Sequence, residues 1–167
     1  ALSSYTKGMI TLYIILGIIA LAVLYIVFAY NSLVRLKQQA IEALSDIDVQ
    51  LKRRFDLIPN LLETVKGYAG HERTVLENVT KARTQLMAAK SPQEQAQADD
   101  FLTNALKTLF AVSENYPDLK ANANFLDLQR ELADTENKIQ AARRFYNANV
   151  RDLNIRIEQF PANIIAN

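Results

Sequence analysis

The only histidine in the chain lies next to a carboxylate, and this pair is the first place where chemistry could occur. Glu72 follows His71 directly. A helical metalloprotease motif needs a second histidine four residues after the first, where this sequence has Val75. The chain also has no cysteine, so it has neither thiolate metal ligands nor a thiol nucleophile. We therefore predict no catalytic residue, no metal site and no cofactor.

Carboxylates could instead build a di-metal centre inside a helical bundle. Such a centre takes a Glu-x-x-His motif from each of two helices, which a single histidine cannot supply. We interpret Glu72, Glu131 and Glu136 as salt-bridged or solvated. The sequence also lacks a Gly-rich phosphate loop, a nucleophile-elbow serine and interleaved basic and aromatic residues. These features argue against an enzyme and against a nucleic-acid-binding protein.

Two clusters of polar residues could contact a partner. Residues 53–56 (RRFD) could meet lipid phosphate or an acidic group, but the basic run Lys52–Arg54 is short, so we favour a solvated helix end. Polar residues also crowd one side of the last predicted helix. For these we favour a satisfied internal network or an exposed flank, with a polar protein–protein surface as the alternative. They are Thr135, Asn137, Arg143, Tyr146, Asn147, Asn149 and Asn154.

An uncharged stretch, residues 9–30, precedes all of these candidates. As a helix rising about 1.5 Å per residue it would span roughly 33 Å, which is long enough to cross a bilayer. Lys7 alone precedes it, whereas Arg35 and Lys37 follow closely. The excess of positive charge after the stretch predicts an outside N-terminus and a cytoplasmic remainder.

The rest of the sequence indicates helices. The chain has 19 Lys and Arg against 18 Asp and Glu, and only four Gly and four Pro. The balanced charge gives no reason to expect a nucleic-acid partner, and the few breakers favour an all-α fold. We predict a short tail (1–8), a transmembrane helix (9–30) and a helical bundle (31–167).

Apolar periodicity predicts four long helices. Pro59 should end the first, although a kinked continuation is the alternative, and Gly67 and Gly70 mark a local break or a close crossing in the second. Ser91, Pro92 and Glu94 form a capping box at the start of the third. Short connections then give an antiparallel up-and-down four-helix bundle that continues from the membrane helix. The predicted helices cover residues 9–54, 57–89, 92–113 and 122–160.

The unequal lengths of these helices predict a surface for association. The long helices must project beyond the shorter third helix, which leaves an apolar stripe of the last helix uncovered. The first helix, lipid or a neighbouring subunit could cover this stripe, and we favour a neighbour because a polar and aromatic mixture resembles an interface. The candidate interface consists of Tyr146, Val150, Leu153, Ile157 and Phe160.

Several blocks of the sequence together resemble the LemA family. They are YNSLV (30–34), DIDVQLKRRFDLIPNLLETVKGYAGHE (46–72), ENYPDLKANANF (114–125), ELADTENKIQAARRFYNANVRDLN (131–154) and FPANIIA (160–166). The resemblance implies one membrane helix and a four-helix bundle on the inner side of a bacterial cell membrane. It also implies a membrane metalloprotease as a candidate partner, because family members are often encoded near such enzymes. No catalytic residues are assigned to the family, so none is carried over.

These observations favour a non-enzymatic scaffold or adaptor that is anchored in the lipid bilayer. We expect it to act through self-association as a homo-oligomer or by docking to another membrane protein. The alternative is a bundle that senses a small ligand bound between its helices.

Overall fold

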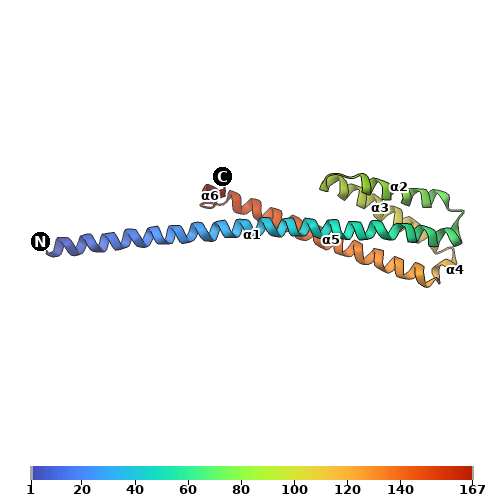
Figure 1. Cartoon of the computed structure of the whole chain (residues 1–167), viewed down its shortest axis with the longest axis horizontal. Helices are drawn as coiled ribbons and strands as arrows, with labels where there is room; N and C mark the ends of the chain where they lie inside the picture. The colour runs from blue at the N-terminus through green and yellow to red at the C-terminus, as the bar shows by residue number, and fades with distance from the viewer. Residues whose placement is uncertain (1, 167) are drawn as a thin grey trace. The chain divides into compact units, whose positions relative to one another are not determined.

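Helices account for nearly all of the computed structural model, which describes residues 2–166, with side chains from 7 to 164. Ala1, the start of the predicted tail, and Asn167, the end of the predicted bundle, lie outside the described residues. No strand occurs in the described part, so the predicted all-α fold is confirmed, but the number of helices differs from the predicted four. The helices are α1 (Leu2–Ala69), α2 (Arg73–Ala88), α3 (Pro92–Ser113), α4 (Pro117–Lys120), α5 (Ala123–Glu158) and α6 (Asn163–Ala166) (Figure 1).

Helix α1 continues through Pro59, so the helix end predicted there is wrong and the alternative, a continuation, is observed. Proline has no N–H, which leaves the carbonyl of Phe55 without its helical donor. Arg83 of α2 supplies a donor, because its Nε donates to Phe55 O at 3.3 Å. The same guanidinium carbon lies 3.8 Å from the centroid of the Phe55 ring. A side chain from another helix therefore compensates for the proline.

The chain leaves α1 at residues 70–72, so the predicted helix 57–89 is divided between α1 and α2. A Cβ atom on Gly70 would lie 3.0 Å from the carbonyl oxygen of Lys66, which favours glycine at this position. Glu72 N donates to Ala69 O at 3.1 Å, and the Tyr116 hydroxyl donates to Glu72 Oε1 at 2.8 Å. The break therefore falls at one of the two glycines that the sequence singled out.

Side-chain caps set the starts of α3 and α5. Ser91 Oγ accepts a hydrogen bond from Glu94 N at 3.1 Å, as the capping box predicts. The Glu94 carboxylate accepts from the backbone N–H of Lys90 at 2.8 Å, one residue before the predicted donor. In α5, Asn122 Oδ1 accepts from Phe125 N at 3.0 Å. The predicted bounds of α3 are confirmed, whereas α5 ends at Glu158, two residues before the predicted end.

Residues 44–143 form one compact unit with an apolar core. The chain reverses direction at residues 70–72, between α1 and α2. Arg83 of α2 donates a hydrogen bond to Phe55 of α1, so these two segments are antiparallel neighbours. The rings of Phe110 in α3 and Phe125 in α5 meet edge to face with centroids 5.9 Å apart. The largest fully buried apolar side chains are Phe125, Ile58, Leu61, Leu102, Leu109, Leu119, Ile139 and Val79.

Residues 1–43 and 144–167 form a second compact unit. In it, Arg156 Nη2 donates to Ser32 Oγ at 3.4 Å, which places the end of α5 beside α1 just after the uncharged stretch. Every described side chain from Lys7 to Phe28 is exposed. In the described part, α1 is the one helix long and apolar enough to cross a membrane. This apolar segment fits a membrane anchor.

Candidate functional site

A buried cluster of charged side chains joins α1, α3 and α5. Arg54 of α1 is only 2% exposed. Its Nη1 lies 2.5 Å from Asp99 Oδ1 of α3 and 2.5 Å from Glu136 Oε2 of α5. Its Nη2 donates to Thr103 Oγ1 at 3.0 Å. One guanidinium group therefore holds two carboxylates from two other helices.

Thr103 and Arg143 extend this cluster. The Thr103 hydroxyl has one hydrogen, which it can donate to Glu136 Oε2 at 3.1 Å or to its own helix at Asp99 O at 2.9 Å. Arg143 Nη2 lies 3.1 Å from Asp99 Oδ2, and Arg143 Nη1 lies 3.2 Å from Asp100 Oδ1. Asp99 is therefore placed between two arginines that come from different helices.

Burial and ion pairing act in opposite directions on the two carboxylates. Burial raises the pKa of Asp99, and the charges of Arg54 and Arg143 offset only part of this effect. Burial also raises the pKa of Glu136, but the hydrogen bond from Gln140 at 3.0 Å, the charge of Arg54 and the bond from Thr103 outweigh it, so that this pKa is lowered. Carboxylates held by fixed guanidinium groups are typical of a structural ion-pair cluster.

The cluster fixes the packing of α1 against α3 and α5. A buried charge that loses its partner costs several kcal/mol, roughly 3–5, so alternative packings that separate Arg54 from its carboxylates are disfavoured. Arg54 Nε and Asp99 Oδ2 have no hydrogen-bond partner among the described residues, although Asp99 Oδ2 is in an ion pair with Arg143. The contacts support a structural role for these residues.

Residues 53–56 do not form the solvated helix end that the sequence analysis favoured. Arg53 is exposed and pairs with Glu131 at 3.5 Å and Asp134 at 3.4 Å, but Arg54 is buried because α1 continues past it. A signal for this burial is present in the sequence. Arg54 occupies the second position of the seam Leu51, Arg54, Ile58 and Leu61, in which neighbours are three or four residues apart.

The interpretation of Glu131 and Glu136 as salt-bridged is confirmed, whereas Glu72 is half-buried and forms no ion pair within the described part of the chain. Glu131 and Glu136 form ion pairs with Arg53 and Arg54, and Glu72 accepts a hydrogen bond from Tyr116. His71, beside Glu72, is exposed. In the part of the chain that the structure describes, no group of three or more His, Cys, Asp or Glu residues is arranged to hold a metal ion.

Both parts of the favoured interpretation of the polar residues on α5 are observed. Thr135 and Asn149 are buried and donate to backbone carbonyls of their own helix at 2.8 Å. Arg143 belongs to the buried cluster. The exposed members of the set are Asn137, Asn147 and Asn154.

The structure places four of the five candidate interface residues on α5. Tyr146, Val150 and Leu153 are half-buried, and Ile157 is exposed. Phe160 follows the end of α5 in a turn and is 80% exposed, so it does not share the helical stripe that the seven-residue spacing predicted.

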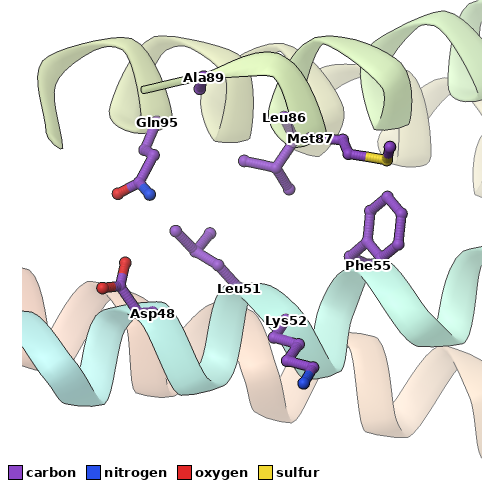
Figure 2. A pocket seen from close by; sticks show the side chains of 8 residues that line it. All are labelled: Asp48, Leu51, Lys52, Phe55, Leu86, Met87, Ala89 and Gln95. Carbon is purple, nitrogen blue, oxygen red and sulfur yellow. The ribbon is translucent and has the colours of Figure 1, made fainter. Parts of the chain in front are cut away.

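A cavity of about 280 Å³ lies between α1 and the α2–α3 connection. In Figure 2, Leu51 points toward Leu86, Phe55 lies beside Met87, and Asp48 and Gln95 point toward each other at one end. A second cavity of about 540 Å³ lies along α2. Its lining residues are Lys66, Gly70, Arg73, Leu76, Glu77, Thr80, Lys81 and Thr84. Ligand sensing by such a cavity stays a prediction.

Comparison with known proteins identifies relatives over most of the chain. Protein LemA of Metamycoplasma hominis is 29% identical over 160 residues, which cover 92% of this chain and 72% of that protein. Magnetosome protein MamQ 2 of Paramagnetospirillum magneticum is 26% identical over 163 residues, 82% of this chain and 60% of the relative. Magnetosome protein MamQ of Magnetospirillum gryphiswaldense is 22% identical over an alignment of 188 residues, 96% of this chain and 69% of the relative.

This chain thus spans less than two thirds of the length of the MamQ 2 protein. The profile of the LemA family matches residues 43–167, a range that contains every residue of the buried cluster. Because the match covers well over half of the sequence, the chain belongs to the LemA family.

Proposed function

We propose that this chain is a non-enzymatic scaffold or adaptor, anchored in the bacterial cell membrane by α1. The observation that carries the proposal is the run of exposed apolar side chains from Met9 to Phe28, on the same helix that provides Arg54 to the buried cluster. A continuous helix with both features would tie a packed helical unit to a bilayer. The names of the relatives, Protein LemA and Magnetosome protein MamQ, are not enzyme names, which agrees with a role other than catalysis.

The packed unit that is presented at the membrane is, in this proposal, an up-and-down four-helix bundle. Its four segments are residues 44–69 of α1, α2, α3 and residues 123–143 of α5. Contacts of Arg83 with Phe55 and of Phe110 with Phe125 support antiparallel neighbours. Its charged core residues are paired with one another, which suits a rigid module whose outer surface contacts partners.

We further propose that the N-terminus is outside the cell and the bundle is cytoplasmic, because Arg35 and Lys37 follow the apolar stretch. The absence of native cysteine allows a clean test with Ser3→Cys and Gln93→Cys. Gln93 is exposed, and its substitution spares the Ser91 cap. In intact cells an impermeant maleimide should label the Ser3→Cys variant only. Labelling of the Gln93→Cys variant only would show the opposite orientation in the membrane.

Scaffolding requires a partner, which we propose to be a second copy of the chain or another membrane protein. A membrane metalloprotease is a candidate at the level of the family. Crosslinking of the full chain in native membranes, followed by mass spectrometry of the crosslinked peptides, tests the scaffold function. We expect crosslinks from α5 to a second copy or to a defined membrane protein. A chain that forms only crosslinks within itself would contradict this function.

A further inference from the structure

One alanine in the apolar part of α1 is covered. Ala29 is 2% exposed, whereas Ala20 and Ala22 of the same helix are exposed, so the side chains of α1 alone do not cover an alanine. Ser32, Ala40 and Ala43 are also buried. These residues and Ala29 share one face of α1, because successive members at positions 29, 32, 40 and 43 are separated by multiples of three or four residues. Within this compact unit, residues 144–167 are the segment that can cover Ala29.

The end of the chain runs along this face toward the apolar stretch. Arg156 Nη2 contacts Ser32 Oγ, and Figure 1 shows α6 beyond the end of α5, toward the N-terminal half of α1. Ala162 comes six residues after Arg156 and is 2% exposed, as is Ala29, three residues before Ser32. The burial of both alanines agrees with packing that extends from Arg156 toward Ala29, inside the uncharged stretch 9–30.

Two large apolar side chains project from this segment. Phe160 is 80% exposed and Ile164 is 70% exposed, although Ala162 between them is buried. Residues 159–167 include no charged side chain. Exposed aromatic and aliphatic side chains without neighbouring charges favour a site that is apolar on one side and wet on the other, as at the boundary between lipid headgroups and acyl chains.

We propose that residues 159–164 form a second membrane contact, in which Phe160 and Ile164 enter the lipid interface beside the point where α1 leaves the bilayer. This inference rests on the proposed function, because it requires α1 to span the membrane. Side chains of such interfacial segments enter the headgroup–acyl boundary by about 5–10 Å. Arg35 and Lys37, which follow the apolar stretch, would lie at the headgroups and favour an anionic surface. The contact would fix the orientation of α5 relative to the bilayer.

The absence of native tryptophan gives a direct test with single-tryptophan variants of the full chain. Phe160→Trp and Ile164→Trp report the proposed contact. Phe28→Trp reports the apolar part of α1. Phe145→Trp is the matched control, because Phe145 is exposed on α5 eleven residues before Arg156. Each variant is placed in vesicles of phosphatidylcholine and phosphatidylglycerol that contain phosphatidylcholine brominated near the top of its acyl chains.

We expect bromine to quench the emission of Phe160→Trp and Ile164→Trp several-fold more than that of Phe145→Trp, with emission shifted to shorter wavelength. Quenching of Phe28→Trp alone would overturn the interfacial contact and leave the membrane span intact. A Phe160→Trp signal at short wavelength without quenching would show that protein, such as a second copy, covers this segment, which also overturns the contact. No quenching of Phe28→Trp would overturn the span itself, and the contact with it.

Discussion

Arg54 is central to the packing of the compact unit formed by residues 44–143. Replacing it by leucine would leave Asp99 buried beside an apolar side chain. We expect Arg54→Leu to lower the free energy of unfolding by about 3–5 kcal/mol, because Glu136 loses its arginine partner and the buried Asp99 keeps only its ion pair with Arg143. Denaturant unfolding followed by circular dichroism measures this loss.

The neighbouring arginine provides the control for this prediction. Arg53 forms exposed ion pairs with Glu131 and Asp134, and exposed pairs contribute little because water and salt screen them. Arg53→Leu should therefore cost much less than Arg54→Leu. Equal losses for the two variants would contradict the structural role of the buried cluster.

Glu136 should make stability depend on pH in the acid range. Its pKa is lowered in the folded state, since its bonds from Gln140, Arg54 and Thr103 outweigh burial. A carboxylate with a lowered pKa stabilises the folded state at pH values above its ordinary pKa of 4.5. This stabilisation is lost as the pH falls through the folded-state pKa. The difference in melting temperature between the native chain and Glu136→Gln should therefore be largest above that value and shrink on acidification. A difference that does not change with pH would contradict the assignment.

Asp99 should make stability depend on pH in the opposite direction to Glu136. Its raised pKa means that the folded state favours its protonated form, so its contribution to stability is present below the ordinary value of 3.8 and is lost as the pH rises through the raised pKa. The sequence analysis favoured a solvated helix end at residues 53–56, although the position of Arg54 in an apolar seam was a signal of burial, and no sequence pattern shows which carboxylates face it. Asp99 and Glu136 are 45 and 82 residues away along the chain, and only the packing of three helices brings them to Arg54.

Helix ends that depend on local hydrogen bonds were predictable, and those that depend on other helices were not. The start of α3 follows from Ser91, Pro92 and Glu94, which act within a few residues of one another. At Pro59 the local rule predicted a helix end, because proline removes a backbone donor. The donor that replaces it belongs to Arg83, 28 residues after Phe55, and no local pattern indicates it.

This explanation of Pro59 predicts a specific coupling. Arg83→Met should destabilise the chain by about 1–3 kcal/mol, because the carbonyl of Phe55 loses its donor. In a Pro59→Ala background the helix supplies its own donor, so the same substitution should cost less. A double-mutant cycle of unfolding free energies measures the coupling. Strictly additive losses would show that Arg83 does not compensate for the proline.

The candidate interface on α5 concerns the association of whole molecules. Ile157 lies on the predicted stripe and is exposed, so Ile157→Asp should weaken self-association in detergent without changing helix content. Ile155→Asp is the control, because Ile155 is also exposed but lies two residues away, on a different face of α5. Light scattering measures the oligomer, and equal effects of the two variants, or a monomeric native chain, would contradict the proposed stripe.

The apolar segment of α1 was the part of the molecule most fully predictable from sequence, because hydrophobic length alone indicates a membrane span. The position of Phe160 was not predictable, since the seven-residue spacing continues past the end of α5 and gives no sign of the turn after Glu158.

Alkaline carbonate extraction of native membranes tests the membrane anchor, the central claim, most directly. The full chain should stay in the membrane pellet, and a variant with Ile19→Lys and Val23→Lys should move to the supernatant while the helix content of residues 44–143 is kept. Each lysine at the centre of a span costs about 2.5–3.5 kcal/mol, so two should prevent insertion. Release of the native chain into the supernatant, as readily as the double variant, would contradict a membrane-anchored scaffold.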